Sequence, residues 1–187
     1  MRQKIKMCFV CLLFTMTVFL STFSANGKAL DISKYRTKSQ TAIVKAINKR
    51  KTAKKAAVNR KATFFYARKA SQKNKKMFVS DADYWGKKGS YFENNLDSGI
   101  NVRGVKILGQ KQSRIQKLLK KKGFKTTGVM RDIANSYYGF VHYQYFFKTK
   151  ALPPDVTKDE QVNVGYDKNM KAVFFRYYPH GSDGCNM

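Results

Sequence analysis

Three residues near the C-terminus are of the types that nucleophilic catalysis uses. His180, Asp183 and Cys185 lie in the stretch YPHGSDGCNM. A nucleophilic cysteine needs a base that a third group holds in place, and a C-terminal loop holds such a geometry poorly. The other histidine, His142, stands in an aromatic stretch without a metal-ligand partner at helical spacing. We therefore predict no catalytic residue, no metal site and no cofactor, and we interpret Cys185 as a surface thiol, with an intermolecular disulfide as the alternative.

Two pairs of acidic residues were the other candidates for chemistry. Asp81 and Asp83 share one side of an extended segment, and Asp159 and Glu160 are neighbours in a loop. General acid–base catalysis needs two carboxylates whose pKa values are tuned apart. The 38 Lys and Arg residues would instead depress the pKa values of nearby acids. The sequence thus predicts a protein that is not an enzyme, and a wall-active enzyme that uses His142, His180 or Cys185 is a competing hypothesis.

The most basic stretch, residues 45–62, reads KAINKRKTAKKAAVNRKA and contains no acid. Ile43 and Ile47 stand at helical spacing at its start, but beyond Lys49 basic residues fall on the same side as these isoleucines. A helix charged all round buries no apolar stripe. It is therefore a solvated basic helix, an arm that binds a polyanion, or a helix that lies on a membrane surface. For the arm, the predicted polyanion-binding residues are Lys45, Lys49, Arg50, Lys51, Lys54, Lys55, Arg60 and Lys61.

The first 25 residues have the order of a secretory signal peptide. MRQKIK carries three positive charges, fourteen uncharged residues follow, and a small, polar stretch comes next. The apolar run is short for a membrane-spanning helix, so we expect cleavage, with a retained anchor as the alternative. The expected localisation is secreted or extracellular, and association with the cell envelope or anchoring by the N-terminal segment is the alternative.

The charge balance predicts an anionic partner. The formal net charge is +27, and self-repulsion on that scale destabilises a compact chain unless a partner offsets it. Outside the cell that partner would be an anionic envelope polymer or an anionic lipid surface, with another envelope protein as a further candidate. Chromosomal nucleic acid is disfavoured because a secreted protein rarely meets it.

Further along, local patterns predict two hairpins and a helix. A hairpin is predicted from two short apolar runs, residues 63–66 and 77–80, that are joined by a basic connection. A loop is expected at residues 81–99, which include Trp85, and a linker could lie there. In KQSRIQKLLKKKGF, Ile115, Leu118 and Leu119 stand at helical spacing and Gly123 ends a short helix. Residues 161–166 and 172–178 predict the second hairpin.

An aromatic strand is expected at residues 136–147, SYYGFVHYQYFF. Alternation predicts its two faces: Tyr137, Val141, Tyr143, Tyr145 and Phe147 on one, and Phe140, His142, Gln144 and Phe146 on the other.

The predicted fold class is α+β: a basic N-terminal helix, then a small domain with a short helix packed on an antiparallel sheet. The expected organisation is a signal peptide at 1–25, a basic helical arm at 26–62 and an α+β domain at 63–187, best defined at 104–178. No internal repeat is convincing in the sequence.

Residues 104–178 resemble the SmpA/OmlA-like envelope modules, which are similar to the halves of β-lactamase inhibitory protein. VKILGQKQSRIQKLLKKKGF resembles the opening of such a module, and VNVGYDKNMKAVFFRYY resembles its last hairpin. Two departures are the absence of a proline after Gly123 and Met170 in place of the hairpin glycine. The resemblance implies a small envelope protein that binds other proteins without catalysis. The matching positions are Ile107, Gly109, Ile115, Leu119, Gly123, Val162, Val164, Tyr166, Asp167 and Val173.

Together these patterns predict a secreted, strongly cationic, non-catalytic protein that binds an anionic cell-envelope surface or partner. The alternative is a secreted toxin or enzyme inhibitor that acts on neighbouring cells or proteins.

Overall fold

The structure is a computed structural model of the 187-residue chain, and it describes residues 28–59, 62–80, 90–131, 139–149, 154–155 and 158–182. The predicted signal peptide and Arg60, Lys61, Trp85 and Cys185 lie outside the described residues. Within these ranges two α-helices accompany mostly antiparallel strands, which confirms the predicted α+β class. No helix of the described part is both long and apolar enough to cross a membrane.

The elements of the first half are β1 (Leu30–Asp31), η1 (Ile32–Tyr35), α2 (Gln40–Asn48), β2 (Ala53–Asn59), β3 (Ala62–Ala67), η2 (Ala70–Gln72), β4 (Lys76–Ser80) and β5 (Phe92–Asn94). The elements of the second half are β6 (Ile100–Val102), β7 (Val105–Lys106), α3 (Gln112–Lys121), β8 (Lys125–Thr126), β9 (Met130–Arg131), β10 (His142–Lys148), β11 (Glu160–Tyr166) and β12 (Ala172–Tyr178).

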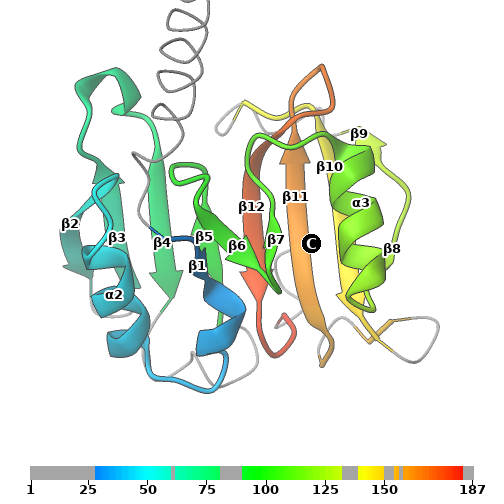
Figure 1. Ribbon diagram of the computed structural model, residues 1–187, viewed down its shortest axis with the longest axis horizontal. Helices are drawn as coiled ribbons and strands as arrows, with labels where there is room; N and C mark the ends of the chain where they lie inside the picture. Colours follow the sequence, from blue (N-terminus) through cyan, green and yellow to red (C-terminus); the bar gives the residue numbers. More distant parts are fainter. Residues whose placement is uncertain are drawn as a thin grey trace, which may run out of the picture.

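One nine-stranded sheet runs through the described part of the chain, in the order β2-β3-β4-β5-β12-β11-β10-β8, with β9 paired to β10. A small second sheet, β1-β6-β7, lies in front of its centre (Figure 1). Both helices cover the same face of the large sheet, α2 over one end and α3 over the other (Figure 1). The molecule therefore has a helix layer on one face of a broad, antiparallel sheet.

The order of elements repeats although the sequence does not. α2 is followed by the meander β2, β3, β4, and α3 is followed by the short β8 and β9 and the meander β10, β11, β12. In the sheet the two meanders end on either side of β5, which pairs with both β4 and β12. The chain thus contains two similar helix–meander units that the sequence pattern does not reveal.

The basic helix expected over residues 26–62 differs from the structure. α2 ends at Asn48, and the basic residues that follow form β2, which pairs with β3 along its whole length. The boundary expected at residue 62 therefore falls inside a hairpin. The physical reason lies in the pattern: basic residues that prevent an apolar stripe on a helix are tolerated on a strand at the edge of a sheet.

The segment expected to be a loop, residues 81–99, contains a central strand. Residues 81–89 lie outside the described residues, but Phe92–Asn94 forms β5 between β4 and β12. Its three residues are all buried, which suits a strand with neighbours on both sides. Three residues are too few for an alternation signal, so the sequence pattern missed it.

The predicted helix and hairpins agree with the structure. α3 covers Gln112–Lys121, and Gly123 follows it with φ of +85°, the left-handed conformation that ends many helices. β3 pairs with β4, and β11 pairs with β12 through the turn at residues 167–171. These elements could be predicted because side-chain periodicity, glycine and turn residues lie within a few positions of one another in the sequence.

The aromatic strand is shorter than predicted, and one residue lies on the other face. β10 begins at His142, and Phe140 stacks on Tyr143 and Phe174 at centroid distances of 5.4 and 5.7 Å. Gly139, at φ of +69°, precedes Phe140 and breaks the alternation. Phe140 also covers Gly165, where an added Cβ would meet its ring at 2.7 Å. Tyr137 lies outside the described residues.

The hydrophobic core lies between the sheet and the two helices. Ile43 and Ile47 from α2 and Ile115 and Leu119 from α3 are fully buried. Burial of each such side chain contributes about 1.5–3 kcal/mol. Strand register aligns a row of buried residues beneath them across the sheet: Val79, Phe92, Tyr177 and Val162. One core cluster includes residues from both units, so the two units share their packing.

Candidate anion-binding surface

The acidic side chains of the described residues all have a partner within the protein. Four are ion-paired with basic side chains, and three accept hydrogen bonds from backbone N–H groups. The ion-paired residues are Glu93, Asp97, Asp155 and Glu160, and the others are Asp31, Asp159 and Asp167. The carboxylates of the described residues therefore interact with groups of the protein itself, either in its interior or in its turns.

The pair of Arg50 and Asp97 is the most deeply buried of these. Arg50 Nη2 lies 3.1 Å from Asp97 Oδ1, and Arg50 Nε also donates to Oδ2. Thr52 Oγ1 donates at 2.7 Å and the Gly99 N–H at 2.8 Å. Burial alone would raise the pKa of the Asp97 carboxyl, but the hydrogen bonds from Arg50, Thr52 and Gly99 outweigh it and hold that pKa below its usual range.

A second pair joins the turn after β6 to the start of β11. Arg103 Nε donates to Glu160 Oε1 at 2.8 Å, and the hydroxyl of Tyr177 donates to the same oxygen at 3.0 Å. The hydrogen bond that Arg103 donates to the Glu160 carboxylate raises the pKa of Arg103. The side chain of Glu160 is 5% exposed, so this carboxylate adds little negative charge to the outer surface.

The third pair lies on the sheet face opposite the helices. Arg176 on β12 stands directly across from Glu93 on β5, with Nε–Oε2 at 2.8 Å. Arg176 also donates to the Tyr178 hydroxyl at 3.1 Å and lies 4.9 Å from the ring centroid of Tyr91. Burial alone would lower the pKa of Arg176, but the Glu93 carboxylate outweighs it and raises that pKa.

The lysines, in contrast, point outward. α3 turns Ile115 and Leu119 into the core, and its remaining surface is basic and contains no acid. The exposed basic residues of this helix and its caps are Lys111, Arg114, Lys117, Lys120, Lys121 and Lys122. Lys120 and Lys121 lie in the last turn, where the helix dipole favours positive charge. We call these six residues the α3 basic face.

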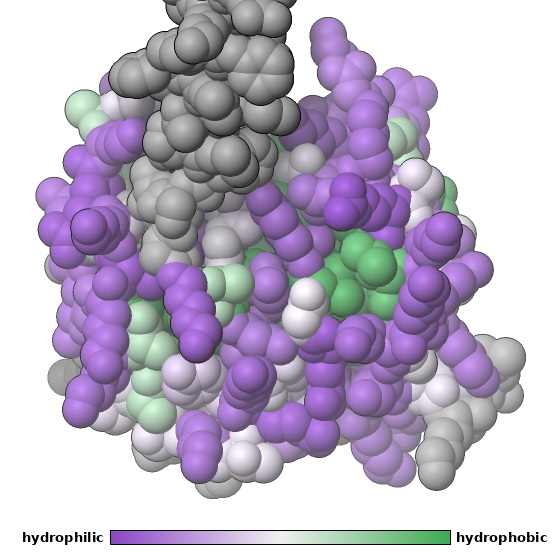
Figure 2. Space-filling view, viewed as in Figure 1, coloured by the Kyte–Doolittle hydropathy of each residue, from purple (hydrophilic) through white to green (hydrophobic). Residues whose placement is uncertain are grey.

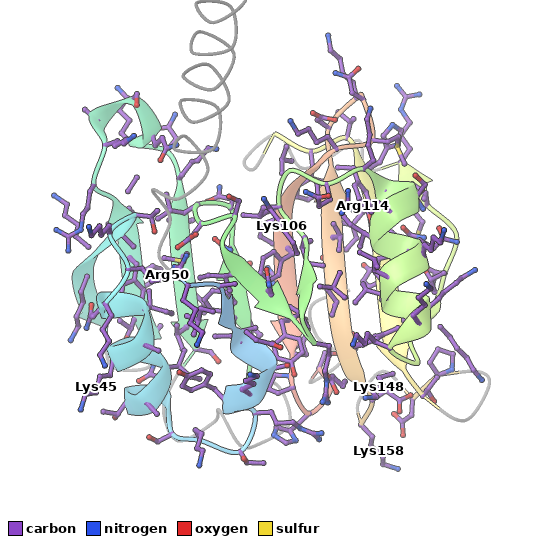
Figure 3. All side chains as sticks on the ribbon, in the orientation of Figure 1. Lys45, Arg50, Lys106, Arg114, Lys148 and Lys158 are labelled. Carbon is purple, nitrogen blue, oxygen red and sulfur yellow. The ribbon has the colours of Figure 1, made fainter. Side chains whose placement is uncertain are left out.

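Most of the predicted polyanion-binding residues in the described ranges are also exposed. Lys45 lies on α2, Lys49 is its C-cap, Lys51 follows in the turn, and Lys54 and Lys55 lie on the edge strand β2. Arg50 is the exception, because its guanidinium is committed to Asp97 and it is 8% exposed. Figure 3 shows Arg50 within the molecule and Lys45 at its border. Arg60 and Lys61 lie outside the described residues.

The sequence reasoning missed the α3 basic face as a binding surface. The helix was predicted together with its terminal lysines, but the stretch at 45–62 holds more basic residues in total and was therefore chosen as the binding surface. Figure 2 shows hydrophilic residues over most of the face that bears α2 and α3, with a compact apolar patch beside α3. Figure 3 shows Arg114 on α3 and Lys106 on β7 on this same side of the molecule.

The candidate catalytic residues do not assemble in the described part of the chain. His142 lies on β10, opposite Tyr166 on β11. His180 Nε2 lies 2.7 Å from the backbone oxygen of Arg36. Asp183 and Cys185 lie outside the described residues, and within those residues no group of three metal-ligating side chains comes together.

Comparison with known proteins finds no match: no family model, no curated protein and no solved structure resembles the chain significantly.

Proposed function

We propose that this chain is a secreted, non-catalytic protein that binds an anionic polymer of the cell envelope through the exposed lysines of its helix layer. The observation that carries the proposal is the separation of charge. Arginines neutralise buried acids in three pairs. In contrast, α3 with its caps, α2 and β2 contain lysines but no acidic residue. An external polyanion would relieve their mutual repulsion.

The mode of binding follows from this geometry. Lysine ammonium groups are flexible point charges, so they suit a polymer with repeated negative charges better than one rigid ligand. Each contact is weak, and the sum is driven by release of the counterions that surround the polymer. Binding should therefore weaken steeply as salt is added.

The secreted location rests on residues 1–25, whose charged, apolar and small-polar order is that of a signal peptide. Fractionation of cells that express the tagged protein tests it. A shortened form released from the envelope fraction by NaCl supports export and retention by charge. A full-length form that resists salt and yields to detergent would mean a retained anchor.

We further propose that residues 104–178 are related to the SmpA/OmlA-like modules that they resemble in sequence. Ile107, Ile115 and Leu119 are fully buried, and Gly109 and Gly123 have φ of +79° and +85°. Such modules bind partners without catalysis, which agrees with a binding role.

The decisive test replaces four charges of the α3 basic face by glutamine: Arg114, Lys117, Lys120 and Lys121. These side chains are exposed and glutamine is a good helix former, so the fold should persist. We expect weaker binding to immobilised polyglycerol phosphate. The slope of log K against log salt should fall by about three, at roughly 0.7–0.9 per lost contact.

The matched control removes four charges away from α3: Lys28, Lys38, Lys69 and Lys73, all exposed and replaced by glutamine. If binding depends on the helix layer, this variant binds the polymer more tightly than the α3 variant at every salt concentration. Equal losses in both variants would mean that net charge alone governs binding and would overturn the proposed surface.

A further inference from the structure

A cleft of about 610 Å³ lies between the two helix–meander units. Its walls are the turn from η2 to β4, the turn after β5, the segment between β7 and α3, and the turn from β11 to β12. Figure 1 shows the η2–β4 turn and the β11–β12 turn at the same end of the sheet, on opposite sides of β5. The volume is in the range of small-molecule sites, which is about 300–1,000 Å³.

The walls are held by hydrogen bonds that do not depend on a ligand. The Gly109 N–H donates to the Ala172 oxygen at 2.8 Å, and the Ala172 N–H donates to the Gln110 oxygen at 2.9 Å. On the other wall, the Lys76 N–H donates to Asn95 Oδ1 at 2.7 Å. The cleft is therefore formed in advance, which lowers the entropic cost of binding.

Gly109 lies beside a lysine at the rim of the cleft. Its φ of +79° favours glycine, and the Cε atom of Lys171 lies 3.9 Å from where a Cβ would stand. The aliphatic stem of Lys171 thus passes close to Gly109. Lys75 lines the cleft from the other unit. Both lysines are exposed.

The remaining lining suits a hydroxylated ligand with an anionic group. Asp167 is the acid among the described lining residues, and its carboxylate accepts the N–H groups of Asn169 and Lys171 at 2.9 Å each. Asn74 and Ser98 supply neutral hydrogen-bonding groups, and Leu108 supplies an apolar surface. Positive charge from two sides, neutral polar groups and one apolar wall match a charged polyol or sugar unit.

We propose that this cleft binds a single anionic unit, a polyol or sugar that carries one phosphate or carboxylate group, between Lys75 and Lys171. The inference rests on the proposed function, since such a unit is the repeating element of an anionic envelope polymer. The helix layer would hold the polymer by charge, and the cleft would select the chemistry of its unit.

The test is titration of the ¹⁵N-labelled protein, observed by two-dimensional amide NMR. The probes are sn-glycerol 3-phosphate and glucuronic acid, with glycerol and glucose as their uncharged counterparts. We expect saturable shifts at the amides of Lys75, Gly109 and Lys171 with a charged probe and none with its uncharged counterpart. The charged probe that binds identifies phosphate or carboxylate as the recognised group.

Two variants test separately whether binding needs the positive charges and whether it needs the volume of the cleft. Replacing Lys75 and Lys171 by glutamine should weaken binding of the charged probe at least about tenfold, which is about 1.4 kcal/mol. Ser98→Trp should block the cleft without a change of charge. The control exchanges Lys69 and Lys73, outside the lining, for glutamine and should bind as the wild-type protein does.

The outcomes distinguish this inference from the proposed function. If neither charged probe binds, or if the Lys75/Lys171 variant binds as wild type, the cleft proposal is wrong, while salt-dependent polymer binding by the α3 basic face can still stand. If the α3 variant keeps full polymer affinity while the cleft variants lose the probe, the proposed surface fails and the cleft remains a site.

Discussion

At the scale of single residues, the three arginine–carboxylate pairs join segments far apart in the chain. Arg50 and Asp97 are separated by 47 positions, Arg103 and Glu160 by 57, and Arg176 and Glu93 by 83. A bidentate guanidinium is suited to such partly buried pairs, whereas the flexible, strongly hydrated ammonium of lysine is suited to the surface. The chemistry of the two side chains thus explains why arginines form the buried pairs and lysines lie on the surface.

Asp97→Asn should destabilise the protein strongly at pH 7. The change leaves the guanidinium of Arg50 buried without an anion, which costs roughly 3–5 kcal/mol when one partner of a buried pair is removed. Urea unfolding measures it. Asp155→Asn is the control, because its pair with Lys158 is exposed and should contribute about 0–1 kcal/mol.

The same variant has a defined pH dependence. The pKa of Asp97 is lower in the folded than in the unfolded protein, so its contribution is present above the unfolded value of 3.8 and is lost as the pH falls through the folded value. The stability difference between wild type and Asp97→Asn should therefore narrow below about pH 4. A difference that is constant from pH 7 to pH 3 would contradict the assigned ionisation.

At the scale of elements, α2 is part of the core rather than a detachable arm. Ile43 and Ile47 are fully buried, and Gln40 Nε2 donates to the backbone oxygen of Ser80 at 2.9 Å. The helix is therefore held to the first unit by packing and by a specific polar contact with β4. Its lysines can bind a polymer only as a surface of the folded domain.

Ile47→Ala should lower the free energy of unfolding by about 2–5 kcal/mol, as cavity-forming changes in a core do. Lys45→Ala, an exposed position on the same helix, should change it by less than about 0.5 kcal/mol. Denaturant unfolding followed by far-UV circular dichroism compares the two. Equal stability of both variants would mean that α2 does not contribute to the core.

At the scale of the whole molecule, repulsion among basic groups opposes folding. The formal net charge is +27, and the acids of the described part are already engaged within the protein. Salt screens such repulsion over a distance of about 10 Å at 0.1 M. The chain should therefore be least stable at low ionic strength and without its partner.

The melting temperature should rise when NaCl increases from about 0.02 to about 0.5 M, because screening weakens repulsion among exposed charges. Differential scanning calorimetry measures the change. The variant that lacks four charges on α3 should show a smaller rise than the wild-type protein. A melting temperature that falls with added salt would mean that attractive ion pairs outweigh repulsion in this fold.

Local signals in the sequence were sufficient for some elements. α3, the β3–β4 hairpin and the β11–β12 hairpin follow from side-chain periodicity, glycine and turn residues within a few positions of one another. The α+β class and the excess of positive charge could also be predicted, because they depend on composition and short-range pattern. These features need no knowledge of which distant segments meet.

Only the tertiary structure decided which segments meet. β5, three residues long, joins the two meanders. Arg50, although it belongs to the basic stretch, is buried in a pair with Asp97, and Lys75 and Lys171 line one cleft. The sequence carries no short-range mark of these contacts, since each depends on strand pairing and burial between parts of the chain that are far apart. Composition and local pattern therefore determined the charge and the elements, while long-range packing decided which basic groups are buried and which remain available to a partner.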